Sequence, residues 1–375
     1  MLLEKRIKMK FTCQKEKLIE AISVVSKAVS SKSTLVVLEG ILVVAKENEL
    51  QLSSNNLDLS ITYTMAASVE EEGSLVFPAR IFGDMVRKIS AETLSFVTNQ
   101  NYMVTVKGGN ATFEIMGLNA EEFPQGQQVS REMYLGLTES MLREMISSTI
   151  FCTASVDLKP ILTGVLFDFK ENELTLVAVD GYRLAKRTIT VEKSNISARF
   201  VIPSKTLSEI YKVLSDNDET VTLYVDDRNI LFEFKNFTVV SRLLEGEFLN
   251  YEAIIPKEHK MTAVVNTSEF IAAIERTSLV VSSEGSKIPI KLEIRDDEIF
   301  LSCTSQMGKV SDSFDAQIEG DSLEIGFNYR YLLDALRASG EKEVKLEFNM
   351  SLNPCLIRPT DGTDYLYMVL PIRLS

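Results

Sequence analysis

The sequence predicts an α+β fold of three similar domains in tandem, each combining antiparallel sheets with amphipathic helices. Three observations carry this prediction: short β-rich runs are joined by polar turns, helical periodicity separates those runs, and the whole pattern recurs about every 125 residues. The length of 375 residues agrees with it, because a single hydrophobic core rarely grows beyond about 250–300 residues.

The clearest mark of the repeat is the pentapeptide KENEL, which occurs at 46–50 and again at 170–174. In the third repeat, RDDEI takes its place at 295–299. Two explanations are open: each copy is an interaction motif, or each copy is the same turn of a repeated domain. The flanks favour the turn, because all three stretches stand between two β-rich runs, which is typical of a hairpin.

Each repeat also contains two amphipathic helical stretches, whose apolar residues recur at intervals of three and four. The second helix follows a short strand and a Pro or Asn, and proline suits an early helical position. The first helices are expected within 17–29, 140–152 and 268–280, and the strands with the second helices within 75–89, 200–214 and 324–338.

A strand–turn–strand segment closes each repeat, and polar stretches with Pro or Gly at 121–133 and 250–260 mark the expected boundaries. Residues 1–8 precede an alternative start at Met9 and are expected to be a ragged extension. The three domains are therefore expected at 1–130, 131–258 and 259–375.

Composition narrows the class of protein. The net charge of −13 argues against nucleic-acid binding over the whole surface, although it leaves room for a local basic face. Four widely spaced cysteines without a CxxC pair indicate reduced thiols. Apolar runs are shorter than the ~20 residues of a membrane span, and no secretory signal opens the chain, so a cytoplasmic protein is expected.

Signatures of catalysis are missing from the sequence. The single histidine, His259, falls in an expected linker, which argues against a His-based triad or a multi-His metal site. Neither GxxxxGK[ST] nor a GxGxxG after a strand occurs, so no catalytic residue, metal or cofactor is expected. One enzymatic alternative remains open: Arg183 and Asp180 acting at a repeat junction, which predicts a deep polar pocket there.

Basic residues recur on the second helix of every repeat, in pairs seven residues apart. Seven residues are nearly two helical turns, so each pair lies on one face. Two interpretations are open: a surface for weak, sequence-independent contact with phosphates, or ordinary salt bridges with Asp84, Glu209 and Asp334. The pairs are Arg80 with Arg87, Lys205 with Lys212, and Arg330 with Arg337.

Two stretches break the internal symmetry. VDGYRLAKR at 179–187 has no counterpart in the other repeats, and it is either a structural loop or a binding loop. The chain ends on YLYMVLPIRLS, where 365–369 is expected to be a final edge strand that stops before Pro371. Residues 370–374 are then expected to form an apolar lip at the surface, and exposed apolar patches tend to mark binding sites.

These features together resemble the bacterial β sliding clamp family, the processivity subunit of the replicative DNA polymerase III. The resemblance covers the chain from Met9 and rests on the MKFTCQKEKLIEAISVVSKAV opening, the three-repeat length, the DGYRLA loop and the VLPIRL ending. It implies a non-enzymatic factor for DNA replication.

The resemblance implies three domains in a crescent, and two crescents that close head to tail into a ring, with helices inside and sheets outside. Such a heterologous contact has to close to avoid a filament. The ring is expected to enclose duplex DNA, which the six helix cations and the loop residue Lys32 are expected to face.

The resemblance also implies a groove between the second and third domains, which receives short apolar or aromatic peptides of polymerase subunits, the clamp loader and repair proteins. Lys159, Tyr182 and Leu249 stand where Arg, His and Pro are common in the family. The expected groove residues are Lys159, Leu162, Val179, Gly181, Tyr182, Arg183, Leu184, Leu249, Ile254, Met368, Val369, Leu370, Pro371, Ile372, Arg373 and Leu374.

The implied homodimer interface joins an edge strand of the first domain to the end of a helix in the third. The expected interface residues are Phe113, Ile115 and Leu118 on one side and Leu279, Val280 and Val281 on the other. A scaffold of the same fold without a DNA role is the remaining alternative; it predicts that the helix cations share no cavity.

Overall fold

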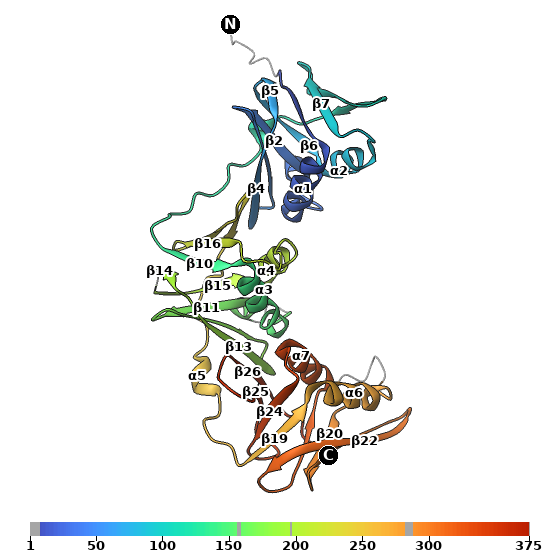
Figure 1. Cartoon of the computed structure of the whole chain (residues 1–375), viewed down its shortest axis with the longest axis vertical. Helices are drawn as coiled ribbons and strands as arrows, with labels where there is room; N and C mark the ends of the chain where they lie inside the picture. Colours follow the sequence, from blue (N-terminus) through green and yellow to red (C-terminus); the bar gives the residue numbers. More distant parts are fainter. Residues whose placement is uncertain (1–7, 156–158, 196, 282–287, 375) are drawn as a thin grey trace. The chain divides into compact units, whose positions relative to one another are not determined.

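The computed structural model describes residues 8–155, 159–195, 197–281 and 288–374, so the expected 1–8 extension lies almost wholly outside the described residues. Backbone contacts group the chain into two compact units (Figure 1). Unit 1 comprises Met1–Glu139, Lys193–Asn195 and Asn217–Leu243, and unit 2 comprises Ser140–Glu192, Ile196–Asp216 and Leu244–Ser375.

Unit 1 contains two antiparallel sheets, with strand orders β5-β1-β7-β8-β9 and β14-β10-β16-β17-β18-β4-β3-β2-β6. Helices α1 (Lys15–Val25) and α2 (Ala79–Lys88) pack against each other, and α1 also packs on β4 (Figure 1). The strands are β1 (Lys10–Gln14), β2 (Gly40–Lys46), β3 (Glu49–Asn55), β4 (Leu59–Ala66), β5 (Ser68–Glu71), β6 (Gly73–Pro78), β7 (Thr93–Thr98), β8 (Met103–Gly108), β9 (Ala111–Met116), β10 (Tyr134–Thr138), β14 (Lys193–Ser194), β16 (Thr220–Val225), β17 (Asn229–Glu233) and β18 (Phe237–Arg242).

Unit 2 is built on one continuous antiparallel sheet with the order β15-β11-β12-β13-β26-β25-β24-β19-β22-β21-β20-β23. Its helices are α3 (Glu139–Ser147), α4 (Ser204–Tyr211), α5 (Tyr251–Ile254), α6 (Thr267–Ser278) and α7 (Tyr329–Ser339). Its strands are β11 (Gly164–Lys170), β12 (Glu173–Val179), β13 (Arg183–Thr190), β15 (Ala198–Pro203), β19 (Met261–Asn266), β20 (Ile290–Arg295), β21 (Glu298–Ser305), β22 (Gly308–Glu319), β23 (Leu323–Phe327), β24 (Glu343–Phe348), β25 (Cys355–Pro359) and β26 (Tyr365–Val369).

The sheets continue from one repeat into the next. Strand β18 of the second repeat pairs with β4 of the first, and β13 of the second pairs with β26 of the third. An unpaired strand edge is a liability, and this pairing removes it at both junctions. The middle repeat is consequently divided between the two units, and the three expected domain boundaries stay a prediction.

The KENEL stretches are hairpin turns, as the flanks predict. They join β2 to β3 and β11 to β12, while RDDEI joins β20 to β21. The two central residues of each turn have positive φ, which a two-residue type I′ hairpin requires. The φ angles are 50° and 62° at Glu47 and Asn48, 50° and 70° at Glu171 and Asn172, and 54° and 62° at Asp296 and Asp297.

The six amphipathic helices expected from the sequence are present, and their entries have physical causes. Pro78 and Pro203 immediately precede α2 and α4, where the missing N–H costs nothing. Asn266 and Asn328 cap α6 and α7 by accepting a hydrogen bond from a backbone N–H in the first turn. Helix α4 ends at Tyr211, so Lys212 lies one residue beyond it, contrary to expectation.

The last strand differs from its prediction in one respect. Strand β26 has the expected bounds, but it lies between β13 and β25 and is therefore not an edge strand. The sequence shows its apolar residues but not that a strand of another repeat pairs with it. Among the described residues, no helix is long and apolar enough to cross a membrane.

Candidate functional site

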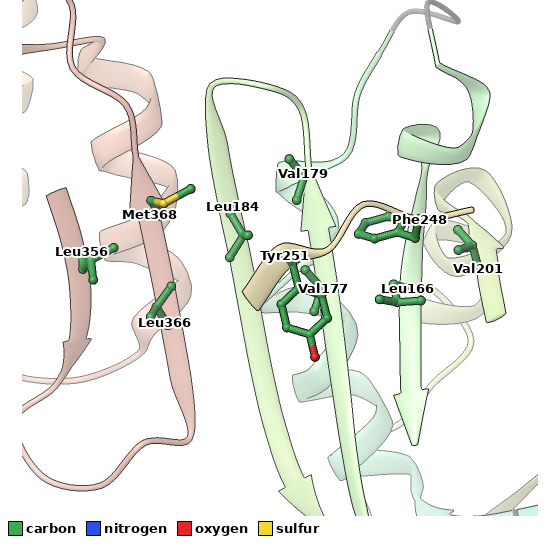
Figure 2. Close-up of a cluster of buried hydrophobic side chains, with 10 residues drawn as sticks. All are labelled: Leu166, Val177, Val179, Leu184, Val201, Phe248, Tyr251, Leu356, Leu366 and Met368. Atoms are coloured by element: carbon green, nitrogen blue, oxygen red, sulfur yellow. The ribbon is translucent and has the colours of Figure 1, made fainter. Parts of the chain in front are cut away.

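The two stretches that break the repeat symmetry meet in unit 2, on one face of its sheet. Val179 on β12 is paired with Leu184 on β13, Leu184 with Met368 on β26, and Met368 with Leu356 on β25. Residues that are directly opposite each other on neighbouring strands share a face. The four side chains therefore form an apolar row across four strands, drawn in Figure 2.

A second row and a covering segment complete the apolar surface. Leu166 on β11 is paired with Val201 and Val177 on its two neighbours. The chain after β18 crosses this face, and it places Phe248 and Tyr251 on the sheet (Figure 2). The partly buried side chains that pack against the cluster are Ile161, Leu162, Leu244, Leu249 and Ile255. Exposed apolar side chains are also present here: Tyr182 is 62% exposed, Ile254 44% and Leu370 36%.

The loop between β12 and β13 is a tight turn organised by Asp180. Its Oδ1 accepts hydrogen bonds from the backbone N–H groups of Tyr182 and Arg183, at 2.9 and 3.1 Å. Gly181 has a φ of +92°, a conformation that a residue with a Cβ rarely adopts. The Leu370 N–H then donates to the Tyr182 carbonyl at 2.9 Å, which joins the loop to the C-terminal tail.

The tail beyond β26 is seated on β23. The Ile372 N–H donates to the Gly326 carbonyl at 2.8 Å. A Cβ at Gly326 would stand 2.6 Å from Leu374 Cδ2 and 2.9 Å from the Ile372 carbonyl oxygen. Glycine at this position therefore allows the close approach that holds the tail.

Arg183 is the polar centre of the site. Its Nε pairs with Asp180 at 2.9 Å, its Nη1 with Asp334 at 2.6 Å, and its Nη2 donates to the Phe151 carbonyl at 2.7 Å. The guanidinium also lies over the Tyr331 ring, 4.5 Å from its centroid. Burial of Arg183 opposes its charge, but the bonds to Asp334 and Asp180 outweigh that effect and raise its pKa.

This network corrects one expectation and adds residues that the sequence did not single out. Asp334 was expected to form a salt bridge within its own helix, but it pairs with Arg183, 151 positions away in the chain. Arg337 pairs instead with Glu275 of α6 at 2.6 Å. Tyr331 stacks on Tyr182 with ring centroids 6.2 Å apart. Tyr331 and Asp334 are three residues apart and therefore lie on one face of α7. That spacing is the only feature of the sequence that indicates that the two residues act together.

The structure therefore gathers most of the expected groove residues around one apolar surface, in several roles. Leu162, Val179, Leu184, Leu249 and Met368 form or pack against the buried cluster. Val369 is 1% exposed, and strand alternation places it on the face opposite Met368, so it supports the surface from behind. Among the expected groove residues, Lys159, Gly181 and Arg373 are exposed, as are Tyr182, Ile254 and Leu370. The tail residues Pro371, Ile372 and Leu374 are partly buried.

The expected DNA-facing cations are exposed in both units. Arg87 pairs with Asp84 at 3.3 Å and Lys212 with Glu209 at 2.6 Å, so the salt-bridge interpretation holds for these two. Within the described chain, Arg80 and Lys205 form no ion pair. That the cations face one cavity stays a prediction. The exposed set is Lys32, Arg80 and Arg87 in unit 1 and Lys205, Lys212, Arg330 and Arg337 in unit 2.

The expected interface residues also occupy accessible places. Strand β9 is an edge of its sheet and carries Phe113, which is 37% exposed, and the partly exposed Ile115. Leu118 lies beyond this strand, forms a β-bridge with Val76 and packs on a small cluster. The expectation that Leu118 belongs to the edge strand is therefore wrong. Leu279 is 79% exposed just after α6, followed by the partly exposed Val280 and Val281.

Comparison with known proteins decides the family. Models of the N-terminal, central and C-terminal domains of the DNA polymerase III beta subunit match residues 9–127, 136–250 and 252–373. The chain belongs to the bacterial DNA polymerase III beta subunit family. These matches cover nearly all of the chain and confirm the three-domain α+β clamp fold.

Individual relatives agree with this assignment. The beta sliding clamp of Staphylococcus aureus strain Mu50 is 33% identical over 375 residues, covering 97% of this chain and 99% of the relative. The Bacillus subtilis DNA polymerase sliding clamp superposes with a TM-score of 0.95 at 34% identity, covering 98% and 100% of the two chains. The Pseudomonas aeruginosa sliding clamp bound to griselimycin gives 0.92 at 26% identity, with the same coverage.

The function expected from the sequence is thereby confirmed. Beta sliding clamps are non-catalytic factors that confer processivity on DNA polymerase III, and this clamp has DNA and the polymerase as its partners. The alternative of an enzyme that uses Arg183 and Asp180 is wrong, as is the alternative of a scaffold without a DNA role. In the structure, Asp180 and Arg183 hold a loop together beside an apolar surface.

Proposed function

We propose that two copies of this chain associate head to tail and close into a ring around duplex DNA in the cytoplasm. Family membership supports the ring. The exposed edge strand β9 with Phe113 and the exposed Leu279 supply unlike apolar surfaces, as a heterologous interface requires.

The ring holds DNA by enclosing it, so its contacts with phosphates need only be weak. The helix cations suit weak contact because they are partly neutralised. Asp84 pairs with Arg87 and Glu209 with Lys212, while Arg80 and Lys205 have no carboxylate partner in the described parts of the chain. Exposed ion pairs contribute only about 0–1 kcal/mol, so phosphates exchange readily with the carboxylates. The whole chain has a net charge of −13, so the surface away from these cations is acidic and repels DNA.

The apolar surface of unit 2 is the groove that receives short peptides of polymerase subunits, the clamp loader and repair proteins. One observation carries this assignment: the apolar row Val179, Leu184, Met368 and Leu356 is flanked by the exposed side chains of Tyr182, Ile254 and Leu370. Apolar anchors fixed by a few polar groups are the usual composition of a peptide groove. A relative, the sliding clamp of Pseudomonas aeruginosa, was crystallised bound to griselimycin.

Deletion of residues 370–375 tests the groove. The truncated chain is expected to lose binding of a fluorescein-labelled decapeptide that ends in an apolar and an aromatic residue, measured by anisotropy. Strand β26 ends at Val369, so the fold and the dimer are expected to remain intact. Intact peptide affinity in a folded truncated chain would refute the assignment. Substituting the exposed Leu352, on the turn between β24 and β25, by serine is the matched control, because it removes one exposed leucine elsewhere.

A further inference from the structure

A buried carboxylate lies on the same sheet face as the groove, and the proposed function does not use it. Asp168 on β11 is 3% exposed. Its Oδ2 accepts a hydrogen bond from the Tyr251 hydroxyl at 3.1 Å. Lys170 and Arg199 approach the same oxygen at 3.3 and 3.4 Å from the solvent side, while Oδ1 has no partner among the described residues.

A carboxylate in such a place needs an explanation, because burying a charge costs free energy unless it is paired and hydrogen-bonded. Most residues of β11 are apolar, and an apolar residue at position 168 would pack against the covering segment without the cost of burying a charge. Tyr251 is the only described residue that donates a hydroxyl to this carboxylate, and it belongs to a segment that crosses the sheet (Figure 2). Asp168 therefore bonds the sheet to the covering segment.

The internal repeat provides an independent comparison. At the 124–125-residue spacing, Phe248 corresponds to Phe123, which packs in a similar small cluster on Val37 and Val76. Asp168 corresponds to Val44, and Tyr251 corresponds to Gly126. The first repeat thus keeps the aromatic anchor but lacks both members of the hydrogen-bonded pair. Of these two repeats, only the second has the pair, and it is the one that contributes β11, β12 and β13 to the groove.

Tyr251 stands between the residues that make one wall of the groove. Leu249 and Ile255 pack against the buried cluster, and Ile254 is 44% exposed beside it. The helix that contains Tyr251 is only four residues long, so its own hydrogen bonds do little to hold it. In Figure 2 the Tyr251 ring lies among Leu184, Val177 and Leu166, and its hydroxyl points along the strands, away from Val179.

We propose that the hydrogen bond from Tyr251 to Asp168 is a latch that fixes residues 249–255 as a rigid groove wall, so that both are positioning residues for peptide binding. This inference rests on the proposed groove. Because the wall is already ordered before the peptide binds, the free energy of binding is not reduced by the cost of ordering these residues. Burial and the neighbouring Asp168 raise the pKa of Tyr251, so the hydroxyl keeps its proton at neutral pH.

Tyr251→Phe is the test, because it removes the hydroxyl and leaves the ring. The probe is the fluorescein-labelled decapeptide described above, and the whole chain is used. We expect about tenfold weaker binding, because apparent affinity falls with the fraction of molecules whose wall is in place. Hydrogen exchange of the 249–255 amides is expected to accelerate in the same variant.

The matched control is Tyr63→Phe in unit 1. Tyr63 is 2% exposed and donates its hydroxyl to Glu20 Oε1 at 2.7 Å, so the same chemical group is removed from the same kind of partner. It is expected to bind the peptide as the native chain does. A second variant, Asp168→Asn, keeps an acceptor for the hydroxyl, and it is expected to lose less affinity than Asp168→Ala.

Two results would overturn the latch: Tyr251→Phe binding the peptide within twofold of the native chain, or Tyr63→Phe weakening it equally. The first would show that the wall needs no anchor, and the second would show a general loss of stability. Failure of the native chain to bind the peptide is a different outcome. It would reject the groove itself, and the latch with it, before any variant is compared.

Discussion

Replacing Arg183 by lysine keeps a positive charge at the centre of the site but removes its planar guanidinium. A lysine ammonium is a point charge, and it is unable to bond Asp180, Asp334 and the Phe151 carbonyl together or to stack on a ring. The variant therefore isolates what the guanidinium adds to the junction of the loop and α7. In the native chain, the Arg183 side chain is 12% exposed and Asp180 is 13% exposed.

The magnitude follows from the bonds that are lost. The bond to the Phe151 carbonyl, 2.7 Å long, involves a charged donor, and such bonds contribute about 1.5–3 kcal/mol. Loss of the position over the Tyr331 ring removes about 0.5–1 kcal/mol more. The Asp334 side chain is 38% exposed, so solvent screening reduces the contribution of its ion pair to little. We expect the local opening free energy to fall by about 2–4 kcal/mol.

Hydrogen exchange measures this opening directly. The Leu370 N–H bonds the Tyr182 carbonyl, so it reports on the contact between loop and tail. A loss of this size accelerates its exchange about thirty- to seven-hundredfold, since each 1.4 kcal/mol is a factor of about ten. Arg143→Lys is the control, because Arg143 also bonds two carbonyls and lies over a ring, that of Tyr211, at 4.4 Å. An unchanged Leu370 rate in Arg183→Lys, or equal acceleration in the control, would refute the reasoning.

Two further predictions concern the tail and the cations. Gly326→Ala is expected to displace the tail, because the new Cβ overlaps Leu374 and the Ile372 carbonyl; overpacking of this kind costs about 1–3 kcal/mol. Peptide anisotropy is expected to show weaker binding. Gly126→Ala, whose Cβ would meet nothing closer than Ser60 Oγ at 3.8 Å, is expected to leave the affinity unchanged, and equal affinities of the two variants would reject the role of the close approach. Charge reversal of the six helix cations to Glu is expected to shorten retention on circular DNA without unfolding, checked by circular dichroism, and unchanged retention would show that they do not contribute to holding DNA. The six are Arg80, Arg87, Lys205, Lys212, Arg330 and Arg337.

Local structure could be predicted from the sequence because its causes are local. The three hairpin turns follow from polar residues between β-rich runs, and the helices follow from three- and four-residue spacing. The internal repeat added more, since it identified the loop at 179–187 and the tail as exceptions. Both lie at the candidate groove.

Partners that are distant in the sequence could not be predicted in this way. Asp334 has a basic residue three positions later, so the local pattern favoured a helix salt bridge, yet Asp334 pairs with the half-buried Arg183 of another repeat. The position of β26 inside a sheet depends on pairing with β13 of another repeat, which periodicity does not encode. Asp168 stands in an apolar strand, and its partner Tyr251 lies 83 positions away. This hydrogen-bonded pair could be identified only from the folded structure.

The most direct test of the account is retention on DNA after the topology of the DNA is changed. The clamp is placed on nicked circular DNA with the proposed clamp loader, the salt concentration is raised, and one portion of the DNA is then cut to a linear form. Because the proposed ring holds DNA by enclosing it and not by phosphate contacts, we expect it to remain on the circles and to leave the linear DNA. Equal retention on both forms, or equal loss from both in high salt, would contradict an enclosing ring.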